Sequence, residues 1–324
     1  MSDETPENTS QEAENEAENT EVPHYPAPVD ELLKLGHPKG QHWQQYRQLG
    51  IDKTHVPELI RMVGDDGLHN ALNQIDGKDN PVVYAPIHAW RALGQLQAVE
   101  AAPALLAKFY RVDDYEDDWV SSEMPIIFKM LGPSTLPALV DYMDPAKSHG
   151  ELSRVTALES LKQIAEIYDE VDDTVKTAMC KMIEVHEQYG DVVNAYLVKY
   201  LVEDFKAVEA SPAIRAVFES GNIETDFIEV YGPDHADVLL GLKPPSVLQD
   251  NPLTADLFDA EGNRIEKPFN PFAMPSMPPA GYAPSAFESG GISGANNKAN
   301  KKKKAKRKQA KASKKKNRNK KKRK

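Results

Sequence analysis

The chain has 324 residues, with 39 basic and 50 acidic side chains and a formal net charge of −11. Its single cysteine, Cys180, excludes an intramolecular disulfide and a cysteine-rich zinc site, so we predict a reducing, cytoplasmic environment. The N-terminal stretch lacks the basic and apolar regions of a secretory signal. No apolar run approaches the ~18–20 residues that cross a bilayer, and we predict no membrane span.

The charge is distributed very unevenly along the chain. Residues 298–324 hold 18 Lys and Arg and no acid, which leaves 21 basic residues against all 50 acidic ones in residues 1–297. Residues 1–29 consist mainly of Glu, Asn, Thr, Ser, Gln and Pro. Such a composition buries too little apolar surface to offset the entropy lost on ordering, so this stretch is predicted to be an acidic disordered tail.

From residue 30 to 242 the apolar residues recur with helical spacing, and four segments resemble one another. Each ends one apolar helix, turns briefly and begins a second: residues 46–63, 90–109, 128–143 and 200–218. A proline stands at the expected start of each second helix, where its missing N–H would lack a partner in any case: Pro57, Pro103, Pro137 and Pro212.

A Leu-Gly pair stands at the expected end of the first helix in three of these segments, at Gly50, Gly94 and Gly132. Glycine adopts the left-handed conformation beyond a helix C-terminus without a steric penalty, so we expect all three to end helices. The prolines are 46, 34 and 75 residues apart, and the last interval is about two units long. A fifth pair, with helices over 154–168 and 172–185, fills it.

Helix pairs that repeat at this length are typical of an α-solenoid. The segment Ala89–Ala107, AWRALGQLQAVEAAPALLA, resembles the short HEAT-like units first named from phycobilin lyases. Residues 41–242 are also similar to an uncharacterised bacterial family of HEAT-like proteins. Some members of that family end in a cysteine-rich zinc knuckle, which this chain lacks. The resemblance implies an all-α fold of about five HEAT-like helix pairs, flanked by disordered tails.

Residues 243–297 are rich in proline and contain the Gly290-Gly291 pair, which predicts a flexible linker. Its aromatic side chains are sparse. They either belong to the linker without a partner, pack back on the helical body, or act as short docking anchors: Phe258, Phe269, Phe272, Tyr282 and Phe287.

Residues 298–324 form a Lys/Arg-rich arm that cannot build a core and is predicted to be disordered and extended by self-repulsion. Phosphates would release counterions on contact, which gives salt-dependent binding without base selectivity. We therefore predict binding to RNA, DNA, ribosomal particles or another polyanion, and no aromatic residue is present to stack on bases. The candidate polyanion-binding residues are Lys301, Lys302, Lys303, Lys304, Lys306, Arg307, Lys308, Lys314, Lys315, Lys316, Arg318, Lys320, Lys321, Lys322, Arg323 and Lys324.

The densest acidic group of the body is a candidate docking site for a basic partner: Asp113, Asp114, Glu116, Asp117 and Asp118. The spacing is continuous and contains no glycine, which excludes an EF-hand calcium loop. We favour the simpler explanation that these acids stand in a loop at the start of a helix near Trp119, because the helix dipole favours them there.

Three further features are interpreted as structural. One His-Glu dipeptide, His186-Glu187, is too few for the di-iron site of the HEAT-repeat deoxyhypusine hydroxylases, which use several. Trp90 lies on an apolar helix face and is expected in the core, and Cys180 is expected to be a buried thiol. We predict no metal and no cofactor.

The predicted function is that of a non-catalytic scaffold or adaptor. The solenoid would hold a protein partner, which its −19 charge over Leu32–Asn297 suggests is basic, while the arm tethers the complex to a polyanion. That charge argues against the basic DNA groove of HEAT-like glycosylases. The alternative is an accessory lyase or chaperone-like protein that acts on a partner protein. In a third interpretation the arm folds onto the acidic body until a polyanion displaces it.

Overall fold

A computed structural model describes residues 24–38, 43–71, 80–250, 255–259 and 265. The chain divides into two units, Met1–Glu266 and Lys267–Lys324, and every described residue belongs to the first. The described residues form helices and turns and contain no β-strand, so the all-α prediction is confirmed. The α-helices are α1 (Val56–Gly64), α2 (Asp66–Ala71), α3 (Ala85–Leu96), α4 (Ala102–Leu106), α5 (Tyr110–Tyr115), α6 (Asp118–Leu131), α7 (Leu136–Tyr142), α8 (Glu151–Ala165), α9 (Asp172–Glu184), α10 (Asp191–Lys199), α11 (Ser211–Ser220), α12 (Pro233–Leu239) and α13 (Val247–Asp250).

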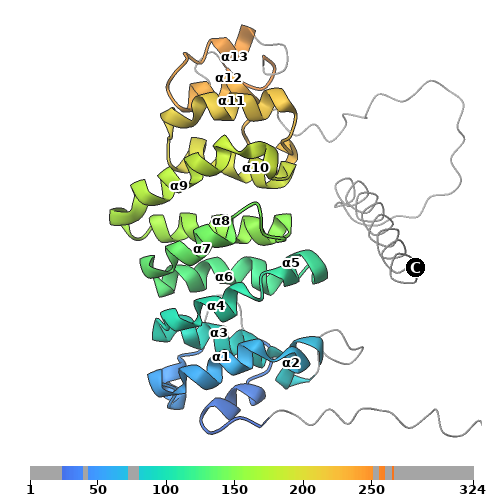
Figure 1. Cartoon of the computed structure of the whole chain (residues 1–324), viewed down its shortest axis with the longest axis vertical. Coiled ribbons are helices and arrows are strands. Elements are labelled where there is room, and N and C mark those ends of the chain that lie inside the picture. Colours follow the sequence, from blue (N-terminus) through green and yellow to red (C-terminus); the bar gives the residue numbers. More distant parts are fainter. Residues whose placement is uncertain (1–23, 39–42, 72–79, 251–254, 260–264, 266–324) are drawn as a thin grey trace, which may run out of the picture. The chain divides into compact units, whose positions relative to one another are not determined.

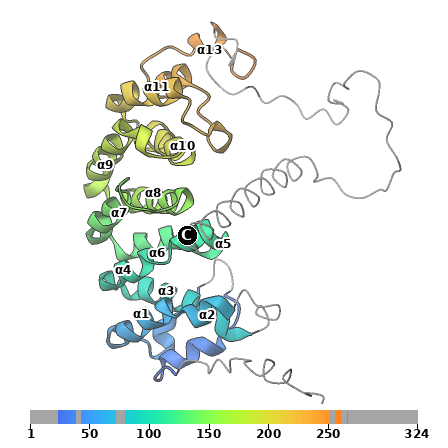
Figure 2. The same cartoon turned by 45° about the vertical axis from the view of Figure 1, so that its right-hand side comes forward.

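The helices of the first unit pack mainly on their neighbours in the chain. In one layer α3 packs on α6, α6 on α8 and α8 on α10; in the other α1 packs on α4, α4 on α7, and α9 on α11. Figure 2 shows α4, α7 and α9 on one side of this unit and α6, α8 and α10 on the other. Helix α8 also contacts α5, α7 and α9. It therefore packs on helices of both layers.

The proline positions follow the predicted turn chemistry. Pro57, Pro103, Pro137 and Pro212 all lie in the first two positions of their helices, α1, α4, α7 and α11. A short 3₁₀ turn precedes each of these helices. Local backbone chemistry therefore sets where the second helix of each pair begins.

The expectation for the three Leu-Gly pairs is correct at two positions and wrong at one. Gly50 and Gly132 follow helical segments with φ of +84° and +88°. Gly94 instead lies inside α3, which continues to Leu96, and Gln97 takes the left-handed conformation. A Cβ built on Gly94 would lie 3.0 Å from Ile127 Cδ1 and 3.3 Å from Met130 Sδ. Gly94 thus allows α6 to approach α3 closely.

A buried ion pair joins α3 to α6. Arg91 donates through Nε to Glu123 Oε2 at 2.9 Å and through its second nitrogen to the other carboxylate oxygen, and both side chains are less than 10% exposed. Trp90 donates its indole N–H to the same carboxylate at 2.8 Å. The rings of Trp43 and Trp119 lie 4.8 and 5.8 Å from the guanidinium carbon. The buried charges are therefore paired, hydrogen-bonded and covered by aromatic rings.

The packed body begins earlier than the predicted boundary at residue 30. Tyr25 and Val29 are buried, and the Tyr25 hydroxyl donates to Asp65 at 2.9 Å. The guanidinium of Arg61 lies 3.8 Å from the centre of the Tyr25 ring. These two apolar side chains are too few to change the composition of the tail, which explains why composition alone places the boundary too late.

The body also continues past Leu242, into the stretch predicted to be a linker. Helix α13 packs on α12, and Phe258 is 4% exposed. The Phe258 ring lies 4.5 Å from that of His235 and 5.8 Å from that of Tyr231. Of the alternatives for the linker aromatics, Phe258 packs back on the body; the other four lie outside the described residues. Within the described part of the chain, no helix is both long and apolar enough to cross a membrane.

We predict that replacing one member of the buried pair is far more damaging than replacing both. Glu123→Leu should lower the free energy of unfolding by about 3–5 kcal/mol, because it leaves the Arg91 charge buried without a counterion. The Arg91→Met/Glu123→Leu double variant should be more stable than Glu123→Leu alone. Urea unfolding followed by circular dichroism measures both. A double variant that is less stable than either single variant would contradict this account.

Two glycine variants test the close approach of α3 and α6. Gly94→Ala should destabilise the protein by about 1 kcal/mol, because Ile127 is buried and has little room to move. Gly64→Ala is the matched control, since its Cβ meets nothing within 4 Å at the exposed end of α1. It should raise the melting temperature, because alanine favours the helix more than glycine does. An equal gain in both variants would show that Gly94 has no packing role.

Candidate functional site

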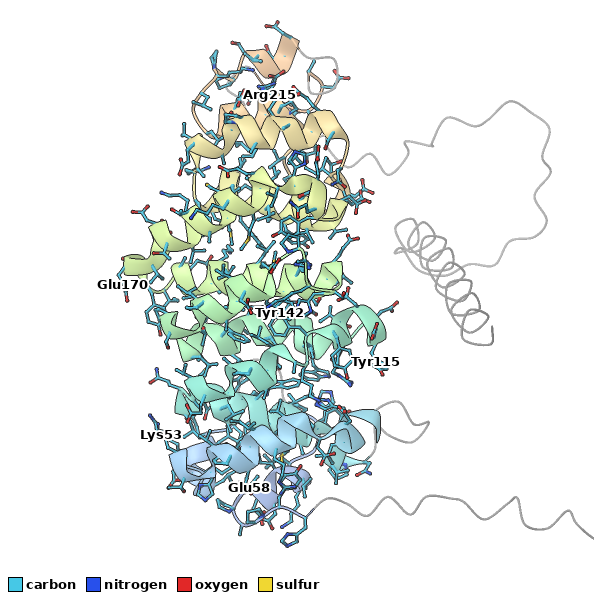
Figure 3. The ribbon with its side chains drawn as sticks, viewed as in Figure 1. Lys53, Glu58, Tyr115, Tyr142, Glu170 and Arg215 are labelled. Carbon is cyan, nitrogen blue, oxygen red and sulfur yellow. The ribbon has the colours of Figure 1, made fainter. Side chains whose placement is uncertain are left out.

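The acidic segment of residues 113–118 lies across the end of α5 and the start of α6. Asp113 and Asp114 are in α5, Glu116 follows it with a φ of +55°, and Asp117 and Asp118 begin α6. The helix start predicted near Trp119 is confirmed. Nearby Tyr115, at the end of α5, is 48% exposed and points outward (Figure 3).

Two of these acids are committed to contacts within the protein. The Asp113 carboxylate accepts N–H bonds from Leu152 at 3.0 Å and Ser153 at 3.1 Å, at the start of α8. Asp117 accepts from the Trp119 N–H at 3.1 Å and from Arg111 Nε at 2.8 Å. These bonds satisfy backbone donors that a helix leaves unpaired at its start.

The remaining members of the acidic segment, Asp114, Glu116 and Asp118, are exposed. Two residues of the segment therefore bond to the starts of helices, and the other three contribute negative charge to the surface. As a docking site for a basic partner it stays a prediction. The predicted polyanion-binding residues, Lys301–Lys324, lie outside the described residues, and their role likewise stays a prediction.

A groove with a volume of about 910 Å³ lies between α7 and α9. This volume is within the range of pockets that bind small molecules, about 300–1,000 Å³. Its lining is mainly apolar: Leu136, Pro137, Val140, Met143, Ala178, Met182, Val185 and Tyr189, with Asp141, Asp144, Asp173, Thr174, Thr177 and Lys181.

The groove lies where two neighbouring helices of one layer pack less closely than the others do. Along this layer α1 packs on α4, α4 on α7, and α9 on α11, whereas α7 and α9 are less closely packed and line the groove. Both helices rest instead on α8. Figure 1 shows α8 beside α7, with α9 following it in the stack.

The loop after α7 forms one wall, and Arg154 holds it in place. From α8 the guanidinium donates to the carbonyl oxygens of Met143 at 2.7 Å, Asp144 at 3.0 Å and Lys147 at 2.7 Å. The Tyr189 hydroxyl donates to Met143 O at 2.9 Å from the other side. Burial raises the pKa of Tyr189, which keeps this hydroxyl protonated as a donor.

The groove lining contains charged as well as apolar side chains. Asp141, Asp144 and Asp173 contribute carboxylates, and Lys181 contributes one ammonium group. Two neighbouring lysines balance the remaining carboxylates, because Lys147 pairs with Asp141 and Lys176 lies 2.8 Å from Asp173. The Lys176 contact holds the pKa of Asp173 below its ordinary value.

A negative excess is present in the chain around the groove. Residues 136–150 and 169–185, which contain most of the lining, carry seven acidic residues and three lysines. Glu170 is one of these acids and lies at the turn before α9 (Figure 3). The arrangement suits a ligand that combines apolar groups with positive charge.

The groove residues were missed as a site in the sequence, although a signal for them was present. Leu136, Val140 and Met143 are spaced i, i+4, i+7, and the same spacing recurs in Ala178, Met182 and Val185. Three of these six residues, Leu136, Met143 and Met182, are buried in the core, whereas Val140 and Val185 are 38% and 37% exposed. The apolar faces of α7 and α9 therefore extend from the core to the surface, which indicates a further packing surface.

The other singled-out residues have structural surroundings. Trp90 is 1% exposed and lies in the core, as predicted. Cys180 is half-buried in α9, and burial raises the pKa of its thiol. His186 is buried in a 3₁₀ turn just after α9. No group of three or more metal-ligating side chains is found in the described part of the chain.

Comparison with models of known protein families, with curated proteins and with solved structures finds no match for this chain. The groove geometry and the charge distribution therefore carry the functional argument.

Arg154→Lys tests whether Arg154 maintains the groove wall. A lysine ammonium lacks the planar fork of donors that reaches three carbonyl oxygens. We expect a loss of about 2 kcal/mol in the free energy of unfolding, because carbonyl groups lose their partners. Hydrogen exchange should accelerate in residues 143–150. Arg47→Lys, at an exposed position, is the control and should change neither quantity. Unchanged exchange in Arg154→Lys would contradict this role.

Proposed function

We propose that this protein is a non-catalytic adaptor. Its helical body would hold a partner protein in the groove between α7 and α9, and its C-terminal arm would bind RNA, DNA or another polyanion. The observation that carries the proposal is the groove itself, which presents apolar side chains of two helices within an acidic stretch of the chain. A groove between helices can receive the apolar face of a segment of a partner protein.

The body is interpreted as an α-solenoid of about five HEAT-like helix pairs. Support comes from the sequential packing of its helices in two layers and from the proline at the start of α1, α4, α7 and α11. Solenoids of this kind provide extended surfaces for partner proteins because each repeat contacts mainly its neighbours. The groove lies between α7 and α9, which pack less closely than the other neighbouring helices of their layer.

The charge of the body favours a basic partner. Leu32–Asn297 carries 21 basic and 40 acidic residues, and residues 136–150 and 169–185 around the groove share this excess. A field of this sign attracts cationic surfaces and repels phosphate. Nucleic acid is therefore assigned to the arm and a protein to the body.

The arm has the composition of a tether that does not select sequence. Its 18 positive charges are separated only by Ala, Asn, Gln and Ser. Counterion release would provide affinity for any phosphate chain. A complex held at two points dissociates more slowly than either contact alone, because the second contact becomes intramolecular. The arm would thus concentrate the bound partner near a polyanion.

The assignment of the arm is tested by comparing the full chain with a truncation that ends at Asn297. We expect the full chain to lose about a thousandfold or more in RNA affinity between about 50 and 200 mM salt, as proteins with six or more phosphate contacts do. The truncation should bind weakly and show little salt dependence. Fluorescence anisotropy with labelled RNAs of two unrelated sequences measures both.

Two full-length variants complete the test. An arm with its residues in shuffled order should bind like the natural chain, and an arm with every Lys and Arg replaced by Gln should bind like the truncation. Equal affinity and equal salt dependence in the full chain and the truncation would overturn the assignment of polyanion binding to the arm.

A further inference from the structure

We propose that the occupant of the groove is an amphipathic α-helix of the partner protein, with apolar side chains facing the groove and Lys or Arg at its flanks. This inference rests on the proposed function, because that function assigns a protein partner to the body. It adds the conformation and the residue pattern of the segment that binds.

The shape of the site favours a helix. The groove lies between α7 and α9, which pack less closely than the other neighbouring helices of their layer. Packed helices lie about 8–10 Å apart, with side chains of one between those of the next. A helix laid between α7 and α9 would pack against both and continue the layer.

The apolar residues on the two walls repeat with helical spacing. Leu136, Val140 and Met143 on one wall match Ala178, Met182 and Val185 on the other, each at i, i+4, i+7. Val140 and Val185 are the most exposed of these side chains, at 38% and 37%. A partner that follows the two stripes from these residues needs apolar residues at the same period, as in other helix-in-groove complexes. An extended strand, whose side chains alternate with a period of two, would turn every second residue away.

The walls also limit the length of the bound segment. Helix α9 has 13 residues, so the longer wall extends about 20 Å. A helix of about three to four turns covers this distance at 1.5 Å per residue. The apolar stripe of the partner is therefore expected to span about 11 to 14 residues.

The charge of the partner follows from the charge around the groove. Asp141, Asp144 and Asp173 are among the lining residues, and residues 136–150 and 169–185, which contain most of the lining, hold seven acids against three lysines. Lys or Arg side chains that flank an apolar helix face can extend to such acids while their stems cover apolar surface. Acidic residues at the same positions would be repelled, which gives the groove a means of discrimination.

The test uses three synthetic 14-residue peptides and the full-length protein. The first contains Leu and Lys patterned with the helical period. The second has the same Leu/Lys composition in strict alternation, and the third replaces each Lys of the first with Glu. Fluorescence anisotropy gives their affinities. We expect the helical Leu/Lys peptide to bind at least about tenfold more tightly than the alternating one, a difference of about 1.4 kcal/mol.

Three protein variants of equal charge locate the binding. Val140→Asp and Val185→Asp place a carboxylate on each apolar wall, at side chains that are 38% and 37% exposed. Val208→Asp is the matched control, because Val208 is 45% exposed and does not line the groove. The first two variants should weaken binding of the helical Leu/Lys peptide about tenfold, since burying a valine contributes about 1.5 kcal/mol or more. Val208→Asp should leave it unchanged.

Equal binding of the two Leu/Lys peptides would overturn the inference, as would equal effects of the two groove variants and Val208→Asp. Tighter binding of the Leu/Glu peptide that depends on Val140 would also overturn it. Circular dichroism confirms that each variant folds. RNA affinity, measured on the same variants, depends on the arm and should not change. Loss of the helical preference with intact arm-dependent RNA binding would refute the helical occupant and leave the adaptor function standing.

Discussion

The body depends on the buried contact between Arg91 and Glu123. Two charges lie in the interior where α3 meets α6, and each is stabilised by the other, by the Trp90 indole and by two further aromatic rings. Removing such charges from water is costly unless their hydrogen bonds are complete. The contact therefore requires α3, α6 and the Trp43 segment to keep one relative position. The N-terminal residues from Tyr25 onward pack beside this fixed group of helices.

The sequence indicates the helix pairs because their signals are local. Pro57, Pro103, Pro137 and Pro212 act on their own turns, whatever lies beyond them. Gly94 was misassigned because its role is a contact with Ile127 and Met130, about 33 residues away, rather than a local turn. Tyr25 and Phe258 were placed outside the body for a related reason: a single buried aromatic residue hardly changes the composition of a polar stretch.

The groove was harder to predict than the helices. Its lining residues follow the same apolar spacing as core residues, so the sequence shows that α7 and α9 have apolar surface but not which surface remains uncovered. That outcome depends on how α8 holds its neighbours and on the three carbonyl contacts of Arg154. The acidic segment of residues 113–118 shows the converse case. Its negative charge is evident in the sequence, yet the Asp113 and Asp117 carboxylates accept backbone N–H bonds at the starts of α8 and α6.

The less close packing between α7 and α9 has a mechanical consequence. Helix α8 packs on α5, α6 and α7 on one side and on α9 and α10 on the other. A force that pulls the two ends of the body apart is therefore transmitted mainly through this one helix. Bending of the body is expected to be easiest at this point, because α7 and α9 support each other least. A ligand that contacts both α7 and α9 would oppose this bending and make the body stiffer.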